Sequence, residues 1–327
     1  MAKKHRKARP LWLQHTLWFC FYALVRTMVM LFCFFPLSAN LQTARVLGLM
    51  WYGPIYRLGR RRDRDRCAAH IRASFPDYSE EQVQACTRES MVHLVQVVFE
   101  MLFTPRLITP TTWQHYVRIE GLHAPLRMLL QAKPVIMCTG HYGSWELLGY
   151  TLACLGFDVH AVMRPLDNPY LNAWLEEVRA RRGLRLLHKK GMSEQAHDLL
   201  SGSAGTSRVV AFIADQDAGR KGVFVPFFGR PASTYKSIAL LAIEYDAAIV
   251  VGQARRIRRD ACLYQMELTR VILPEEWKDQ ADPVGFITAE YTRAIEQGVR
   301  LDPAQYLWIH RRWKTAPPPG RSARIVA

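Results

Sequence analysis

The chain has 327 residues, enough for one large domain with an ample core, and half of them are hydrophobic, which excludes a disordered protein. Its 44 Lys and Arg residues outnumber 28 Asp and Glu residues, so the formal net charge is +16 and an anionic partner is expected. Nucleic acid, an anionic membrane surface and an acidic carrier protein all meet that description. The seven cysteines are scattered and form no Cys-x-x-Cys pair, which argues against a disulfide framework or a zinc site and for a reducing compartment.

The N-terminal segment predicts a membrane anchor. Residues 1–10 are basic, and the apolar stretch from Leu11 to Leu37 is long enough to span a bilayer. A secretory signal peptide is rejected because its apolar region should be shorter and should end at a small-residue cleavage site. A second basic cluster at 57–66 means that a single span would leave one cluster on the wrong side of the membrane. A re-entrant or interfacial helix keeps both clusters cytoplasmic and lets Arg26 snorkel, so the anchor need not cross fully.

Helices are predicted over residues 40–117, where Ser79 suits the N-cap of an apolar helical pattern. From about Tyr116 the pattern changes to strands that alternate with helices. The candidate strands are 116–120, 134–139, 157–163, 184–187, 208–214, 247–253 and 263–270. The candidate helices are 144–155, 169–182, 192–201, 235–246 and 283–299. This alternation favours an α/β fold with a mixed, largely parallel central sheet flanked by helices.

These patterns divide the chain into parts of different character. The expected parts are a basic N-terminus with an anchor helix at 1–38, a helical region at 39–115 that packs on the core, an α/β domain at 116–314 and a disordered tail at 315–327.

The stretch Thr139-Gly140-His141-Tyr142-Gly143-Ser144-Trp145-Glu146 is the strongest candidate for catalysis. It joins an apolar strand to a helical pattern through a glycine turn, a geometry that lifts a side chain out of a sheet edge. Because His141 precedes the helix, the chain can fold back and bring the Glu146 carboxylate to the imidazole. A carboxylate on one ring nitrogen fixes the tautomer and leaves the other nitrogen free to take a proton. On its own the spacing is weak evidence, since it arises often by chance and a lone His is usually structural.

Other candidate site residues follow predicted strands or end a helix. Arg164 directly follows a strand, where α/β proteins place their sites, although a solvated turn residue is the alternative. Arg179 lies near the end of a helix, which basic residues favour, and its planar fork also binds phosphate or a carboxylate. Asp215 and Gln216 end the strongest apolar strand. Asp215 and Asp217 are close enough to suggest a metal, but no third ligand is evident.

Two further segments are unusual in composition. Residues 223–230 are very apolar for a loop, which suits a wall for an acyl chain, a membrane contact or simply core. Residues 306–314 interleave aromatic and basic side chains, which suits an interface with lipid headgroups or stacking on nucleobases.

Taken in order, these residues resemble the late acyltransferases of lipid A biosynthesis in Gram-negative bacteria, the lauroyl/myristoyl transferase branch of the lysophospholipid acyltransferase superfamily. The motifs that carry the resemblance are the His-x4-Glu box (His141, Glu146), Arg164-Pro-Leu-Asp-Asn-Pro, Arg179, Asp215-Gln216-Asp217, Val225-Pro226-Phe227-Phe228-Gly229 and Tyr306-Leu307-Trp308-Ile309-His310-Arg311-Arg312. The resemblance implies transfer of a fatty acyl group from acyl carrier protein to a hydroxyl of a lipid A precursor, an anionic glycolipid. The reaction is expected at the bacterial inner membrane, with the catalytic domain facing the cytoplasm.

The same resemblance gives the site residues their expected roles. His141 would act as general base with Glu146 orienting it, and the substrate would be bound by residues that include Arg164, Arg179, Asp215 and Gln216. Arg164 and Arg179 could bind acceptor phosphate or, alternatively, hold Glu146. No metal or bound cofactor is expected, and nucleic acid is not an expected partner.

Four alternatives remain on the sequence alone. A glycerophospholipid acyltransferase is disfavoured because those enzymes typically carry His-x4-Asp and a later Glu-Gly-Thr-Arg block, which this chain lacks. An acyltransferase for mannosylated phosphatidylinositol is closer in sequence, and a thioesterase would differ only in using water. A non-catalytic basic membrane-binding or nucleic-acid-binding protein is suggested by charge, but the intact His141 and Glu146 and the anchor weigh against it.

Overall fold

The computed structural model describes residues 10–57, 61–121, 134–181, 183–188, 192–201 and 208–318. The predicted basic residues 1–9 and the end of the predicted tail, 319–327, lie outside the described residues.

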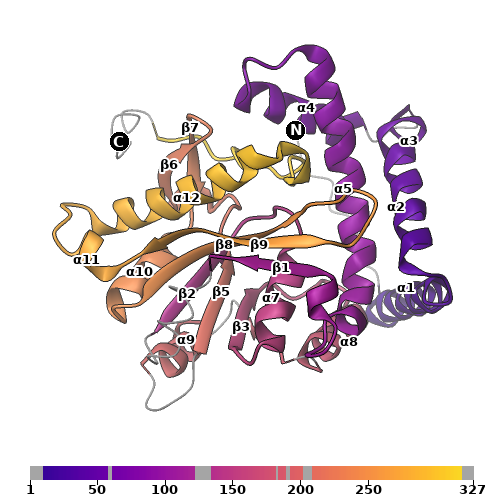
Figure 1. Ribbon diagram of the computed structural model, residues 1–327, viewed down its shortest axis with the longest axis horizontal. Helices are drawn as coiled ribbons and strands as arrows, with labels where there is room; N and C mark the ends of the chain where they lie inside the picture. The colour runs from indigo at the N-terminus through magenta and orange to yellow at the C-terminus, as the bar shows by residue number, and fades with distance from the viewer. Residues whose placement is uncertain are drawn as a thin grey trace.

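A seven-stranded sheet forms the centre of the molecule, in the order β1-β9-β8-β2-β5-β3-β4 (Figure 1). The strands from β8 to β4 are mutually parallel, β9 pairs antiparallel with β8, and β1 pairs parallel with β9. The predicted mixed, largely parallel sheet is therefore confirmed. The strand bounds are β1 (Val117–Glu120), β2 (Val135–Thr139), β3 (Asp158–Met163), β4 (Arg185–His188), β5 (Arg208–Ile213), β6 (Val223–Phe227), β7 (Arg230–Thr234), β8 (Ala248–Arg256) and β9 (Tyr264–Ile272).

Helices cover both faces of this sheet. The helix bounds in the described chain are α1 (Leu11–Phe32), α2 (Leu37–Tyr52), α3 (Pro54–Arg57), α4 (Arg61–Ser74), α5 (Glu80–Leu107), α7 (Trp145–Cys154), α8 (Pro169–Ala180), α9 (Met192–Leu200), α10 (Ser237–Glu244), α11 (Pro274–Trp277) and α12 (Pro283–Leu301), with short 3-10 turns at Trp113–His115, Gly219–Lys221 and Pro303–Gln305. In Figure 1, α12 lies above β8 and β9, and α7 lies below them.

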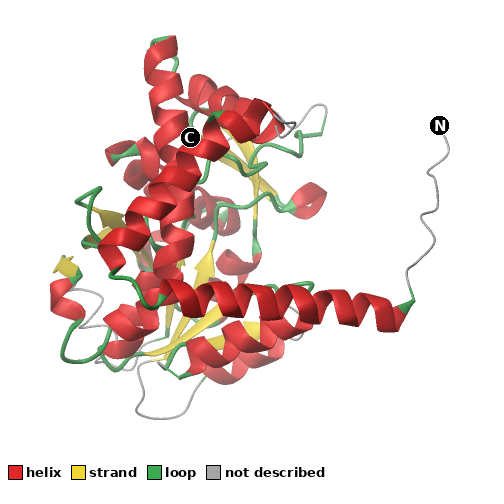
Figure 2. Ribbon diagram, turned by 90° about the vertical axis from the view of Figure 1, so that its right-hand side faces the viewer, coloured by secondary structure: helices red, strands yellow, loops and turns green. Residues whose placement is uncertain are grey.

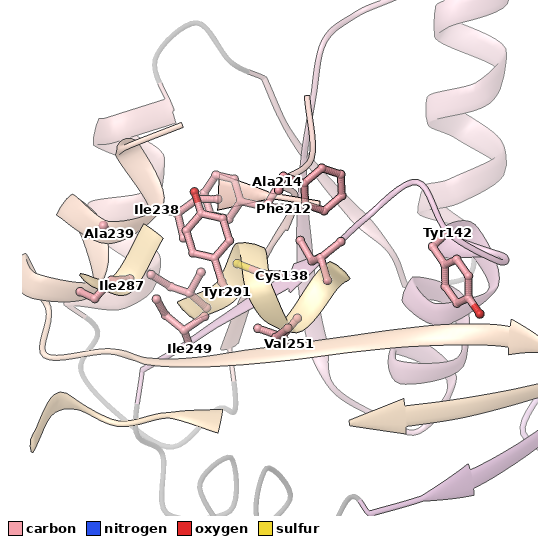
Figure 3. Packing of buried hydrophobic residues seen from close by; sticks show 14 of the residues in the cluster. Cys138, Tyr142, Phe212, Ala214, Ile238, Ala239, Ile249, Val251, Ile287 and Tyr291 are labelled. Carbon is pink, nitrogen blue, oxygen red and sulfur yellow. The ribbon is translucent and has the colours of Figure 1, made fainter. Parts of the chain in front are cut away.

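The central strand β2 shows why the sheet has a core on each side. All five of its residues are buried, as expected for a parallel strand covered on both faces. Because successive side chains point to opposite faces, Ile136 and Cys138 pack in the core beneath α10 and α12, while Val135 and Met137 pack in the core beneath α7. Figure 3 shows the first of these cores, with Cys138 near Tyr291 of α12.

The N-terminal helices form a flank beside the sheet. α5 begins at the predicted cap: Ser79 and Gln82 form a reciprocal capping box. α2 packs along α5 (Figure 1). α1 has no buried residue, and it is the helix of the described chain that is long and apolar enough to cross a bilayer. Figure 2 shows it extending beyond the body of the molecule.

The two segments of unusual composition both belong to the interior. Residues 223–234 form the antiparallel hairpin β6–β7, whose Val225 and Phe227 are buried. Of the three interpretations of this segment, an acyl-chain wall, a membrane contact or core, the structure supports core. The lipid or nucleobase interface predicted at 306–314 is wrong, because Trp308 and Arg312 are each only 1% exposed. The Arg312 guanidinium donates to the Ser233 carbonyl at 2.6 Å. Hydrogen bonds of this kind to backbone acceptors offset the cost of burying its charge.

Candidate active site

Two neighbouring parallel strands bring the candidate site together. In the register of β2 and β5, Thr139 lies opposite Ile213, and the Ala214 N–H donates to the Thr139 carbonyl at 2.8 Å as the chains leave the sheet. His141 and Asp215 each lie two residues beyond that last pair. Since the carboxyl ends of parallel strands meet at one edge, both side chains arrive at the same place.

One carboxylate holds both the ring and the backbone of His141. Asp215 Oδ1 lies 2.6 Å from His141 Nδ1, and Asp215 Oδ2 accepts from the His141 backbone N–H at 2.8 Å. Burial alone would raise the pKa of Asp215, but the imidazole and these hydrogen bonds outweigh burial and lower that pKa. An ionised carboxylate at Nδ1 places a proton there, which leaves Nε2 free to accept one.

Three side chains surround the free nitrogen and the ring of His141. The amide nitrogen of Gln216 lies 3.4 Å from Nε2, and the rings of Trp145 and His310 have centroids 5.0 and 4.5 Å from that of His141. Burial, and then the neighbouring His141, lower the pKa of His310 to about 4. His310 is therefore neutral at neutral pH and can donate or accept a hydrogen bond. It lies in a motif that carries the resemblance, but sequence reasoning gave it no role.

Of the two contacts expected for Glu146, the structure has the one with Arg179 and not the one with His141. Its carboxylate accepts from Arg179 Nε at 2.5 Å and from Arg179 Nη2 at 2.9 Å, a bidentate ion pair with both side chains largely buried. Burial alone would lower the pKa of Arg179, but Glu146 outweighs it and raises that pKa, so the guanidinium stays charged. The expectation that Glu146 orients the His141 ring is corrected: Asp215 makes that contact, because α7 directs Glu146 towards α8.

Arg164 lies at the rim of the site and makes no contact with Glu146. Its side chain is 81% exposed and pairs with Asp167, an exposed pair that contributes little to stability. It nevertheless lines, together with Gln216, a cavity of about 240 Å³ at the carboxyl ends of β3 and β5. Arg164 and Gln216 therefore share one cavity, as a substrate-binding role for both requires.

A second, mostly apolar cavity of about 110 Å³ lies between the sheet and α7. Trp145, Glu146 and Arg179 line it, together with apolar side chains such as Met137 and Leu148. The two cavities share four lining residues, Val162, Met163, Phe212 and Ile213, so they adjoin. The polar groups near His141 thus lie next to an apolar cavity that suits a hydrocarbon chain.

Comparison with known proteins identifies the family of the chain. A model of the family described as bacterial lipid A biosynthesis acyltransferase matches residues 7–315. The chain belongs to this family. The chain is 33% identical to the lipid A biosynthesis lauroyltransferase of Escherichia coli (strain K12) over 159 residues. The matched region covers 48% of each chain, so it spans about half the length of that relative.

Two other relatives place the chain within the family. The lipid A biosynthesis acyltransferase of Haemophilus influenzae is 26% identical over 259 residues, 76% of each chain. A phosphatidylinositol mannoside acyltransferase of Mycobacterium tuberculosis is 29% identical over 115 residues, 35% of this chain and 36% of its own. The resemblance drawn from the motifs is therefore confirmed at the level of the family.

In this member of the acyltransferase family, the turn that carries His141 is fixed from several sides. Gly143 has φ +58°, and a Cβ there would lie 1.8 Å from the Ala254 carbonyl oxygen, so glycine is required. The Gly143 N–H donates to the Gln305 carbonyl at 3.1 Å, and His93 Nε2 lies 3.2 Å from the Gly143 carbonyl oxygen. Burial, and then Arg256, lower the pKa of His93 to about 3, so His93 is neutral and serves as a donor.

Sequence reasoning gave no role to His93 or Gln305. His93 lies within the predicted helical region, and nothing in the local pattern distinguishes it from a core residue. Its position opposite Gly143 is a property of the tertiary fold.

Asp217 does not join Asp215 in a shared site. It accepts from the Thr315 hydroxyl at 2.9 Å and so ties down the C-terminal segment. Within the described ranges, no group of three or more His, Cys, Asp or Glu side chains is arranged to hold a metal ion.

Proposed function

We propose that the protein transfers a fatty acyl chain from an acyl carrier protein thioester to a hydroxyl of a lipid A precursor, with His141 as general base. The observation that carries this proposal is the His141–Asp215 contact of 2.6 Å beside an apolar cavity. Family membership supports the reaction class, and the names of the Escherichia coli and Haemophilus influenzae relatives, both of lipid A biosynthesis, support the acceptor.

The chemistry follows from the free nitrogen of His141. Nε2 takes the proton of the acceptor hydroxyl as the oxygen attacks the thioester carbonyl carbon. The new C–O bond forms, the C–S bond breaks, and the imidazolium returns the proton to the departing thiolate. Asp215 stabilises the imidazolium in between, and general-base assistance of this kind contributes about 10²–10⁴-fold in rate.

Charged and polar groups near the base suit an anionic acceptor. Arg179, paired with Glu146, and Arg164, paired with Asp167, place guanidinium donors on two sides of the adjoining cavities. The Gln216 amide lies next to Nε2, where it can orient the acceptor hydroxyl. The N-terminal turn of α7 presents backbone N–H groups to the oxyanion that develops on the thioester carbonyl.

The net charge of the protein and its exposed apolar helix support the proposed membrane attachment, and exposed basic residues support the proposed acyl donor. The unburied helix α1 and the net charge of +16 favour attachment to an anionic bilayer, which we place at the cytoplasmic face of the inner membrane. An acidic carrier protein needs a basic docking surface, and both Arg181, just after α8, and Arg185, at the start of β4, are exposed. Arg182, Lys189 and Lys190 are close to these two arginines in the chain and would extend the basic surface, but they lie outside the described residues.

The decisive experiment incubates the purified full-length protein with a lipid A precursor and either acyl carrier protein or coenzyme A thioesters, and analyses the lipid by mass spectrometry. We expect one added acyl chain, faster formation with the carrier donor, and no product with His141→Ala. A parallel reaction offers mannosylated phosphatidylinositol, because one relative is named for that acceptor. Acylation of that lipid alone, or thioester hydrolysis without transfer, would reject the proposed acceptor.

A further inference from the structure

A cavity of about 380 Å³ lies away from His141, between the end of α1, the last turns of α5, and α8. Its volume falls within the range of roughly 300–1,000 Å³ that is typical of sites for small ligands. Most of its lining is apolar, including Val29 of α1, Leu102 of α5 and Val178 of α8. Figure 2 shows that the long helix α1 runs along the body here before extending beyond it.

This cavity is lined by a face of α8 that does not include Arg179 of the candidate active site. Trp174, Val178 and Arg181 line it and recur at the spacing of one helix face. Arg179, by contrast, is turned by about 100° from Val178 around the helix axis and pairs with Glu146. The acyl acceptor and the thioester must reach His141, so neither is the natural occupant of this cavity.

The cavity carries uncompensated positive charge. Arg26, Arg106 and Arg181 line it, with Glu177 as the single carboxylate, and Glu177 already pairs with Arg181. In the part of the chain that the structure describes, Arg26 and Arg106 have no ion pair. The Arg26 guanidinium instead lies 5.1 Å from the centroid of the Trp174 ring.

The surroundings of Arg26 point to a lipid. α1 exposes large apolar side chains along its length, among them Phe19, Leu24 and Leu31. An arginine in such a helix is expensive in a bilayer unless its guanidinium meets water or an anion. A phosphate is the anion that a bilayer offers, and the planar guanidinium binds phosphate through two parallel hydrogen bonds.

We propose that this cavity binds one anionic glycerophospholipid of the bilayer, with its phosphate held by Arg26 and Arg106 and an acyl chain between α5 and α8. The single negative charge of the phosphodiester offsets part of the charge of the two arginines, and the bound lipid joins the anchor helix to the body of the protein. The site does not depend on the acyl-transfer chemistry, since His141, Asp215 and Gln216 do not line it.

The test uses full-length protein in nanodiscs that contain phosphatidylglycerol and phosphatidylcholine, with bound lipid counted by native mass spectrometry. We expect one retained phosphatidylglycerol for the unmodified protein. In Arg26→Gln/Arg106→Gln, its affinity should fall about tenfold or more, because two charge-assisted hydrogen-bonding groups are lost. The matched control is Arg258→Gln/Arg293→Gln, which removes the same charge from exposed sites elsewhere and should retain the lipid.

A second variant separates the cavity from its charge. Val178→Trp fills the apolar part and keeps all arginines, so it should also lose the lipid while its melting temperature reports that it is folded. Equal retention in all variants would overturn the proposal. Equal binding of phosphatidylcholine would overturn the preference for an anionic headgroup, and retention of a lipid A precursor in place of phosphatidylglycerol would show that the site belongs to the acceptor.

Discussion

Asp215 Oδ1 lies 2.6 Å from Nδ1 of His141, although 74 residues separate the two in the chain. The second oxygen of the same carboxylate accepts the backbone N–H of His141, so one side chain sets both the tautomer of the ring and the position of the turn.

Asp215→Asn should therefore lower kcat by about 10²–10⁴-fold, as loss of general-base assistance does, with a smaller change in KM. The amide can donate to Nδ1 and stabilise the tautomer in which Nε2 carries the proton and cannot accept one. Steady-state kinetics on the folded variant measure the effect. Because the two residues act as a unit, His141→Ala/Asp215→Asn should be little slower than His141→Ala alone.

Asp217→Asn is the matched control for that substitution. Asp217 contacts Thr315 and not the imidazole, so its variant should keep kcat within about tenfold of the unmodified enzyme, a loss of no more than about 1.4 kcal/mol in transition-state stabilisation. An Asp215→Asn enzyme that turns over normally while His141→Ala is inactive would contradict the assigned role of the carboxylate.

The ion pair between Glu146 and Arg179 makes a separate prediction about stability. Glu146→Ala leaves the guanidinium buried without its partner, and breaking a buried pair in this way costs about 3–5 kcal/mol. We expect a clearly lower melting temperature for this variant in detergent. Glu146→Ala/Arg179→Met removes both charges and should recover most of the loss, without recovering activity if the Arg179 cation binds the acceptor. A single variant as stable as the unmodified protein would contradict this account of the pair.

Much of the fold follows from local sequence, because apolar runs and turn residues predict β2, β5 and the helices between them. The pairing of His141 with Asp215 does not, since it depends on β5 lying next to β2 while β3 and β4 intervene in the chain. The short spacing of His141 and Glu146 suggested a local contact instead. That interpretation was wrong because α7 begins at Trp145 and directs Glu146 to α8.

The C-terminal segment shows a second limit of sequence reasoning. Trp308 and Arg312 have the composition of a membrane interface, but composition does not tell whether an arginine will find internal acceptors. In the fold, Arg312 donates to Ser233 and Thr234 of β7, and the indole of Trp308 donates to the Pro303 carbonyl. The bonds of Arg312 join parts of the chain 78 and 79 residues apart, so no local pattern predicts them.

Membrane attachment is predicted to depend on α1. Because the aromatic residues at 224–228 and 308–313 are largely interior, they offer little alternative attachment. Removal of residues 1–38 should move most of the protein to the soluble fraction, as measured by flotation with liposomes at low and high salt. Removal of residues 1–9 alone leaves α1 intact and should weaken binding mainly at low salt, where exposed charges act over longer distances. Unchanged flotation of the longer deletion at high salt would place the anchor elsewhere.

The last prediction concerns acid and the buried His93. Burial, and then Arg256, lower its pKa to about 3, so the folded protein keeps this ring neutral while the unfolded chain protonates it below about pH 6.5. Stability from this residue is thus complete above about pH 6.5 and is lost as the pH falls, by about 1.4 kcal/mol per pH unit.

His93→Gln keeps a donor for the Gly143 carbonyl but cannot titrate. Between about pH 7.5 and about pH 5, its free energy of unfolding should fall by about 2 kcal/mol less than that of the unmodified protein. Melting temperatures at both pH values measure this difference, and because His70 and His310 are unchanged in the variant, only the contribution of His93 is isolated. If both proteins lose the same stability on acidification, His93 is not held neutral in the fold.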